Sequence, residues 1–315
     1  MLLAPEVIAN LLVDTLFAVY GFIAFWVSLE VVMRWDFSRS DELQYRLSKR
    51  MYLVSTITKY IFFFKILMLL FFIYTLDHLS NVISGAMCAV GVIDASTYGI
   101  YLMFLKVLNV YFFAFWIVLN DEDYRHRNLP YTKLKSLFFL LLYALLVAEV
   151  ALEYLYFFDI KPNSLVDCCG AVFSSEARSW ISLFLSLPNF YVYSLFYVLF
   201  AGLLLSYLLK ARAVYAVLSA LFVPVAILSL IGYFGTYIYE LPTHHCPFCL
   251  MQSDYNYVGY FLYAFLFLAT FNGMLVAFIK DERRWRVSLV FLMLYVGVVS
   301  YYPLYYFVVN GKWLY

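Results

Sequence analysis

The cysteines are the residues of this sequence with the clearest capacity for chemistry. There are five of them: Cys88, Cys168, Cys169, Cys246 and Cys249. The last two form a Cys-x-x-Cys arrangement that directly follows His244 and His245. Two thiols at this spacing can cycle between dithiol and disulfide, and thiols together with imidazoles also bind zinc or copper. One loop of the chain therefore offers two kinds of chemistry.

The composition places these cysteines in a membrane protein. The chain has 315 residues and is 66% hydrophobic but only 13% charged, whereas soluble domains have about 25% charged residues. Stretches of about twenty apolar residues recur, which is the length that crosses the hydrocarbon core as a helix. The net charge is +1, and no stretch of basic residues lies outside the short connections. We therefore expect the lipid bilayer, and no nucleic acid, as a partner.

The hydrophobic pattern predicts an all-α protein, a polytopic transmembrane helical bundle of about eight helices in a single integral membrane domain. The expected spans are residues 7–33, 52–76, 98–119, 137–158, 180–209, 214–238, 257–279 and 287–309. Pro188 and Pro224 fall inside two of these spans and could kink them. Only residues 210–212 separate the fifth span from the sixth, so seven spans are the alternative.

The basic residues predict the orientation of these spans. Four connections contain Arg34, Arg39, Arg46, Lys49, Arg50 and Lys59; Arg125, Arg127, Lys133 and Lys135; Lys210 and Arg212; and Lys280, Arg283, Arg284 and Arg286. The opposite side has only Lys161, Arg178 and Lys312. The positive-inside rule puts the basic connections in the cytoplasm. Both termini and all five cysteines would then be extracytoplasmic, where disulfides persist, and we expect a bacterial or archaeal cytoplasmic membrane.

The Cys-x-x-Cys loop has features that favour thiol chemistry. Pro247 directly follows Cys246 and suits the first turn of a helix, where its missing N–H is not needed. In such a helix Cys246 and Cys249 would lie one turn apart on one face. The helix N-terminus and the neighbouring His244 and His245 would then stabilise a thiolate.

Residues 246–252, with the sequence CPFCLMQ, resemble the Cys-x-x-Cys loop of the DsbB-type disulfide-bond-formation membrane proteins. The resemblance implies electron exchange between an extracytoplasmic thiol protein and a membrane quinone. It makes Cys246 and Cys249 the quinone-proximal pair and lets Cys168 or Cys169 stand in for the second pair. The chain departs from that family in four ways, one of which is that His244 and His245 are not part of the family's motif. The family has four helices, its second pair is not vicinal, and Ser253 stands where the family often has Arg.

Three functional interpretations remain open. The first is a thiol–disulfide redox protein coupled to a membrane electron carrier, a quinone. Its site residues are Cys88, Cys168, Cys169, Cys246 and Cys249. The second is a copper- or zinc-handling membrane protein. Its ligands are His244, His245, Cys246 and Cys249. The third is a non-catalytic subunit of a membrane complex with structural disulfides, which the odd number of cysteines disfavours.

Ionisable side chains inside the spans are a second group of candidates: Lys65, Lys106, Glu149 and Glu153. A charge at the bilayer centre costs about 2.5–3.5 kcal/mol on the insertion scale, so these groups should pair or face a polar cavity. Glu149 and Glu153 share one helix face, and Lys106 lies at a similar depth to Glu149. We expect these three to form the wall of a quinone pocket or a proton path; the alternative is a buried ion pair that fixes helix register. Asp14 is a further candidate.

Overall fold

The structure is a computed structural model that describes residues 3–36, 41–83, 85–86, 88–126, 128–160, 188–279 and 281–315. Within these ranges there is no β-strand, and eight helices are long and apolar enough to cross a membrane. The prediction of an all-α, polytopic membrane protein with eight spans is therefore confirmed. Cys168, Cys169 and residues 180–187 of the expected fifth span lie outside the described residues. The extracytoplasmic location of the termini stays a prediction.

The chain packs into two compact units. Unit 1 comprises Met1–Ser84 and Val92–Val166, and unit 2 comprises Gly85–Gly91 and Asp167–Tyr315. The short segment Gly85–Gly91 thus packs with unit 2, although the chain on both sides of it belongs to unit 1. The single membrane domain stays a prediction, since one membrane domain can contain two compact groups of helices.

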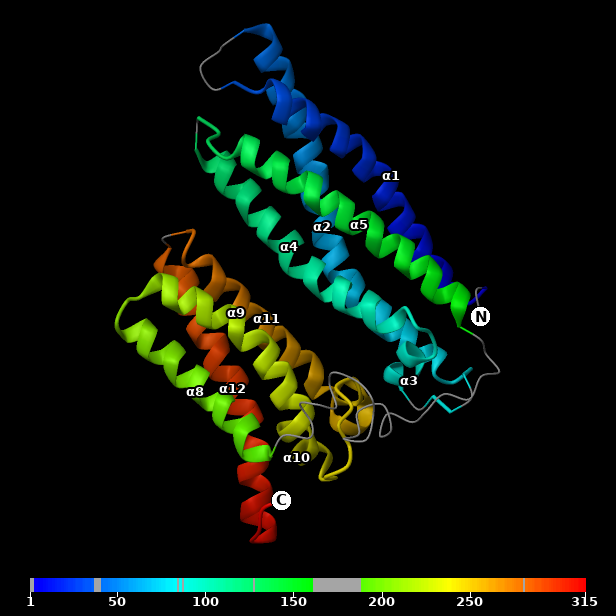
Figure 1. The fold of residues 1–315 in the computed structure, drawn as a ribbon, viewed down its shortest axis with the longest axis vertical. Helices are drawn as coiled ribbons and strands as arrows, with labels where there is room; N and C mark the ends of the chain where they lie inside the picture. Colours follow the sequence, from blue (N-terminus) through cyan, green and yellow to red (C-terminus); the bar gives the residue numbers. More distant parts are fainter. Residues whose placement is uncertain are drawn as a thin grey trace. The chain divides into compact units, whose positions relative to one another are not determined.

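Unit 1 contains four long helices: α1 (Pro5–Arg34), α2 (Glu42–Leu79), α4 (Gly99–Arg125) and α5 (Thr132–Asp159). Helix α1 packs against α2 and α5, and α4 closes the ring by packing against the same two helices (Figure 1). Helix α2 begins ten residues before the expected span, because Asp41 caps it by accepting a hydrogen bond from Gln44 N at 3.1 Å. The first turns of α2 are polar, so hydropathy alone does not detect them.

The interior of unit 1 divides into an aromatic part and a charged part. The aromatic part is formed by Phe62, Phe113, Trp116 and Phe139, which are all buried. Phe62 stacks on Phe113 with ring centroids 4.3 Å apart and meets the Trp116 ring edge-on at 5.2 Å. Such ring pairs contribute about 0.5–1.5 kcal/mol each beyond the burial of their surface. The charged part lies further along the same helices and is described with the site.

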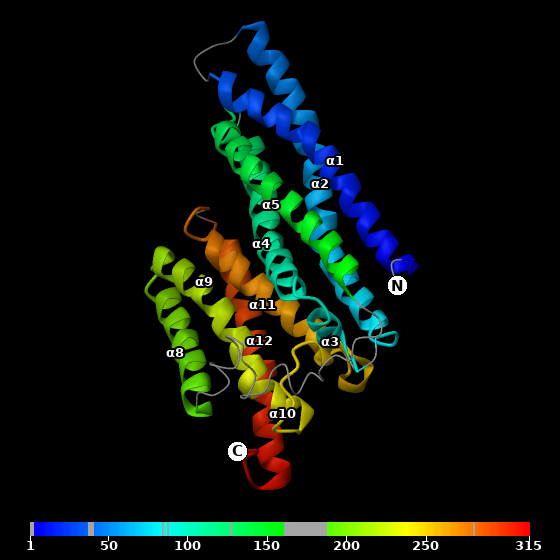
Figure 2. The ribbon, with the colours of Figure 1, turned by 45° about the vertical axis from the view of Figure 1, so that its right-hand side comes forward.

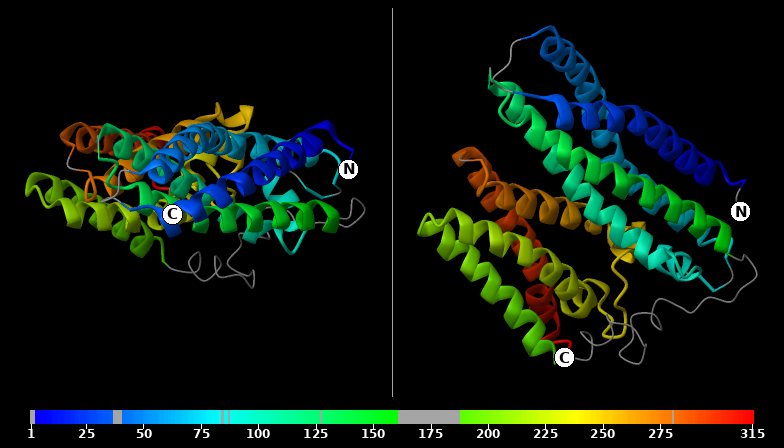
Figure 3. Two further views of the ribbon diagram at one scale, coloured as in Figure 1. Left: turned by 90° about the horizontal axis from the view of Figure 1, so that it is seen from above. Right: turned by 45° about the horizontal axis from the view of Figure 1, so that its top comes forward.

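Unit 2 also contains four membrane-spanning helical segments. These are α8 (Asn189–Leu208); α9 (Arg212–Ser229), continued by the π-helical turn η1 (Leu230–Phe234) and α10 (Gly235–Tyr239); α11 (Val258–Leu275); and α12 (Glu282–Asn310). Helix α9 packs between α8 and α11, and α11 packs against α12 (Figures 2 and 3). A hydrogen bond of 2.8 Å between Tyr197 Oη and Ser300 Oγ joins α8 to α12.

The two prolines predicted inside spans behave differently. Pro188 is the residue before the first turn of α8, so the expected kink at this position is wrong. A proline is suited to this place because the first residues of a helix need no N–H donor. Pro224 does lie inside α9, and the helix continues into η1 six residues later. Wide π-helical turns of this kind leave backbone carbonyls available for other partners.

Candidate thiol site

Three cysteines from two distant parts of the sequence meet in unit 2. The sulfur of Cys88 lies 3.5 Å from that of Cys246. The sulfurs of Cys88, Cys246 and Cys249 all lie within 4.8 Å of one another. All three side chains are buried. The separation of 3.5 Å between the Cys88 and Cys246 sulfurs is longer than an S–S bond of about 2.05 Å, so these two sulfurs are in contact without being bonded to each other.

A tight turn holds Cys88 at this site. Cys88 directly precedes the short helix α3 (Ala89–Asp94), and its carbonyl oxygen accepts a hydrogen bond from Gly91 N in the first turn of that helix at 3.1 Å. A Cβ atom on Gly91 would lie 2.9 Å from the Ala86 Cα atom. The turn that presents Cys88 therefore needs a glycine at this position.

Two tyrosines fix the Cys-x-x-Cys loop by its backbone. Tyr239 at the end of α10 donates its hydroxyl hydrogen to the carbonyl oxygen of Cys246. Tyr263 of α11 donates to the Pro247 oxygen at 2.7 Å. Tyr255 packs edge-on against Tyr239 with centroids 4.6 Å apart. Burial and the neighbouring Cys249 raise the pKa of Tyr255, so this hydroxyl remains neutral. The sequence alone does not single out these tyrosines, because the chain has 31 of them and no spacing distinguishes these three.

The α-helix expected to begin at Pro247 is not formed. Residues 246–248 are not helical, Cys249–Met251 form a single 3-10 turn called η2, and α11 begins only at Val258. The reason is that the loop folds back onto the first turn of α11. A Cβ atom on Gly259 would lie 2.8 Å from Met251 Cγ and 2.9 Å from the Leu250 carbonyl carbon. The expected stabilisation of a thiolate by a helix N-terminus therefore does not apply here.

This close approach leads to a first prediction. Gly259→Ala should destabilise the protein by about 1–3 kcal/mol, because the added methyl group has no space against the loop. The substitution should also raise the alkylation rate of Cys249, because the adjacent residues Leu250 and Met251 must move to make room for the methyl group. Thermal unfolding and thiol mass spectrometry measure both effects. Gly297→Ala in α12 is the matched control, since its Cβ would meet nothing within 4 Å. Equal losses of stability in the two variants would contradict the packing.

The two histidines have their own positions in the loop. His245 Nδ1 lies 2.9 Å from the Ile231 carbonyl oxygen in η1. A carbonyl can only accept, so Nδ1 carries the hydrogen and Nε2 is the basic nitrogen of the neutral ring. The His244 ring packs against the Tyr239 ring with centroids 4.2 Å apart. Neither histidine joins the group of three ligands; Cys88 completes it instead.

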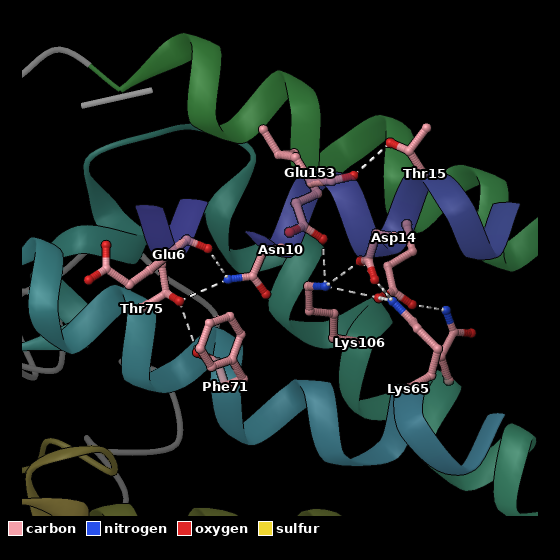
Figure 4. A network of polar contacts seen from close by, with 12 residues as sticks. Glu6, Asn10, Asp14, Thr15, Lys65, Phe71, Thr75, Lys106 and Glu153 are labelled. Atoms are coloured by element: carbon pink, nitrogen blue, oxygen red, sulfur yellow. Dashed lines mark hydrogen bonds and ion pairs between the residues drawn. The ribbon is translucent and has the colours of Figure 1, made fainter. Parts of the chain in front are cut away.

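The charged residues predicted inside the spans also meet, in unit 1 (Figure 4). Lys106 Nζ lies 2.9 Å from Glu149 Oε1 and 2.7 Å from Glu153 Oε2. Lys65 Nζ lies 2.8 Å from Asp14 Oδ2 and 2.7 Å from Glu149 Oε1. The structure thus brings the candidates Lys65 and Asp14 together with Lys106, Glu149 and Glu153. The cavity beside this network has a volume of about 10 Å³, which suits one water molecule rather than a quinone ring.

Comparisons of the chain with protein-family models, with curated proteins and with solved structures give no match. The functional assignment therefore depends on the chemistry of the two sites. The thiol site in unit 2 has the residues of a redox or soft-metal centre. The charged network in unit 1 has the residues of a proton or ion-pair site.

Proposed function

We propose that the protein is an integral membrane thiol–disulfide oxidoreductase. In the proposed reaction, a disulfide between Cys246 and Cys249 is exchanged for one between Cys88 and Cys246. The observation that carries the proposal is the approach of three sulfurs to within 4.8 Å of one another. Two thiols would be enough for one structural disulfide. A third thiol within reach allows a disulfide to be passed on by exchange.

The proposed exchange is balanced in atoms and electrons. A bound quinone accepts two electrons and two protons, while Cys246 and Cys249 form an S–S bond. The Cys88 thiolate then attacks Cys246 Sγ, which forms the Cys88–Cys246 bond and releases Cys249 as a thiolate. This second step only relocates the disulfide. Cys168 and Cys169 would pass it to an extracytoplasmic thiol protein.

The surroundings of the sulfurs suit this chemistry. Phe248, Tyr255 and Tyr263 pack against the hydrophobic cluster that contains the three cysteines, and an aromatic, apolar surrounding suits a quinone ring. His245 has a basic Nε2 in the same loop. In the described residues of unit 2, four helical segments are long and apolar enough to cross a membrane, and the Cys-x-x-Cys loop connects two of them. This unit is therefore closer to the four helices of the DsbB-type family than the whole chain is.

A soft-metal centre is the second candidate, and the same three sulfurs favour it. Ligand sulfurs about 2.3 Å from a central ion in a trigonal arrangement lie about 4 Å apart, which is within the spread observed here. Thiolates are the preferred ligands of Cu(I) and also bind zinc. This candidate uses Cys88 as a ligand in place of His244 and His245, which were predicted from the sequence.

Differential alkylation of the purified protein in lipid nanodiscs tests the proposal. With a short-chain ubiquinone analogue, Cys246 and Cys249 should be recovered as a disulfide; with dithiothreitol they should both be alkylated. Metal analysis of the same samples should find no stoichiometric copper or zinc. A thiol state that is identical under the two conditions would reject the redox function. About one copper or zinc ion per chain, lost in Cys88→Ser, would establish the metal centre instead.

A further inference from the structure

The buried charges of unit 1 do not balance. Lys65 and Lys106 carry two positive charges, whereas Asp14, Glu149 and Glu153 would carry three negative charges. Each of the five residues is at most 5% exposed. Among the described residues, no further Lys, Arg or His forms an ion pair with these carboxyl groups. An uncompensated charge in the membrane interior costs several kcal/mol, so the network needs one more positive charge.

Each of the two lysine ammonium groups already has three carboxylate oxygens as hydrogen-bond acceptors. Lys65 Nζ contacts both carboxylate oxygens of Asp14 at 2.8 Å and Glu149 Oε1 at 2.7 Å. Lys106 Nζ contacts Asp14 Oδ2 at 3.4 Å, Glu149 Oε1 at 2.9 Å and Glu153 Oε2 at 2.7 Å. An ammonium group has three hydrogens. Both lysines are therefore fully used.

Glu153 is the carboxyl that these donors satisfy least. Both oxygens of Asp14 and both oxygens of Glu149 accept hydrogen bonds, the second Glu149 oxygen from Asn109 Nδ2 at 2.6 Å. Glu153 Oε1 is buried without a hydrogen-bond partner among the described residues. Tyr156, one turn along α5, does not supply one, since its hydroxyl donates to Val92 O at 2.8 Å.

A proton on Glu153 resolves the charge and the hydrogen bonding together. It makes the network neutral and turns the unpartnered oxygen into a donor. Carboxylate oxygens of Asp14, Glu149 and Glu153 lie within 4.8 Å of one another, so an acceptor is close by. Leaving a buried polar atom without a partner costs about 1–3 kcal/mol, and more for a charged group.

A line of polar side chains leads from this network to one end of the bundle (Figure 4). Glu6, Asn10 and Asp14 are spaced four residues apart on α1 and so share one helix face. Asn10 Nδ2 donates to Thr75 Oγ1 at 2.8 Å. Glu6 Oε1 lies 3.7 Å from His78 Nε2, and these two side chains are 23% and 55% exposed. The line covers about 12 Å along the helix axis.

The opposite direction is closed by apolar rings. Phe62 on α2 and Phe113 on α4 lie beyond Lys65 and Lys106 on the side away from Thr75. Their rings stack at 4.3 Å, and Phe139 of α5 packs against Phe62 at 5.8 Å. Proton carriers such as ordered water need polar partners, and this aromatic layer offers few. The polar side chains of Glu6, Asn10, Thr75 and His78 therefore all lie on the other side of the charged network.

We propose that unit 1 contains a proton-binding site in which the Glu153 carboxyl holds one exchangeable proton, reached through Asn10 and Thr75 from the end marked by Glu6 and His78. The proposal does not depend on the thiol chemistry of unit 2. The site uses its two lysines to hold Asp14 and Glu149 as carboxylates, which leaves Glu153 as the group that accepts and releases the proton. By the positive-inside rule, the open end faces the extracytoplasmic side.

Infrared spectroscopy of the full chain in lipid nanodiscs tests the proposal, because a protonated carboxyl has a carbonyl band that a carboxylate lacks. At pH 7 the wild type should show this band. Glu153→Gln should lack it and keep the wild-type melting temperature, since an amide imitates the protonated carboxyl. Asp14→Asn should melt at a lower temperature, because its carboxylate holds both lysines. Persistence of the band in Glu153→Gln would overturn the assignment of the proton.

The exchange of this band after transfer from H2O to D2O tests the access route. Thr75→Val keeps the shape of the side chain but removes its hydroxyl group, and should slow the exchange at least about tenfold. Thr15→Val is the matched control, because Thr15 Oγ1 pairs with Tyr154 Oη at 2.8 Å outside the route. Equal exchange rates in these two variants would overturn the route. Loss of the band when sodium replaces choline at constant ionic strength would make this a sodium site and overturn the proton site.

Discussion

Replacing Lys106 with Met should destabilise the protein by about 3–5 kcal/mol, because it leaves buried carboxylates without their partner. Lys106 Nζ contacts Asp14, Glu149 and Glu153 and is 5% exposed. Protonation of further carboxyl groups could restore neutrality but not the three hydrogen bonds. The free energy of unfolding in mixed detergent micelles, measured by denaturant titration, reports the loss.

Lys59→Met is the matched control for this variant. Lys59 Nζ lies 2.7 Å from Asp121 Oδ1, so the ion pair is as short as those of Lys106, but its side chains are 39% and 43% exposed. An exposed pair contributes about 0–1 kcal/mol. Comparable losses in the two variants would show that burial of the unit 1 network does not matter for stability.

Cys246→Ser should lower quinone-dependent disulfide exchange by at least about 100-fold, because both steps of the proposed reaction use Cys246 Sγ. In the first step this sulfur bonds to Cys249, and in the second to Cys88. A hydroxyl group cannot form either bond. The rate of disulfide transfer to a reduced acceptor peptide, followed by mass spectrometry, measures the effect.

Cys88→Ser separates the two steps. This variant should still oxidise Cys246 and Cys249 when a quinone analogue is added, but it should not transfer the disulfide onward. A redox relay predicts this difference between Cys88→Ser and Cys246→Ser. A metal centre predicts that both variants lose their ion. Transfer at the wild-type rate in Cys88→Ser would remove Cys88 from the proposed reaction.

Much of the fold could be predicted because membrane helices have a simple composition. The bilayer excludes unpaired backbone groups, so each long apolar stretch must be a helix. The eight apolar helices of the described residues therefore follow from hydropathy, and the predicted spans differ from the observed helices mainly at their ends. Helix α2 starts early because its first turns are polar, and the position of Pro188 depends on where α8 begins rather than on hydropathy.

The site was predicted less completely. The meeting of Lys106 with Glu149 follows from their similar depth in the membrane, and Asp14 was a candidate for the same reason. The participation of Lys65 depends on which face of α2 points inward, which a helix that is apolar all round does not reveal. The local structure at Cys246 was predicted wrongly. Pro247 suits the start of a helix, but the packing of Leu250 and Met251 on Gly259 delays the helix to Val258.

The sequence by itself determined the kind of protein and the residue types available for chemistry, and it limited the number of expected spans to seven or eight. Composition and hydrophobic length are enough for these, because lipid restricts the chain to helices. Only the tertiary structure decided which of these residues lie together. Cys88 joins Cys246 across 158 positions of the chain because the segment Gly85–Gly91 packs with unit 2. Likewise, Glu153 Oε1 receives no hydrogen bond among the described residues because other carboxylate oxygens take up the lysine donors. This depends on how four helices face one another, and residue spacing along a single helix does not reveal it.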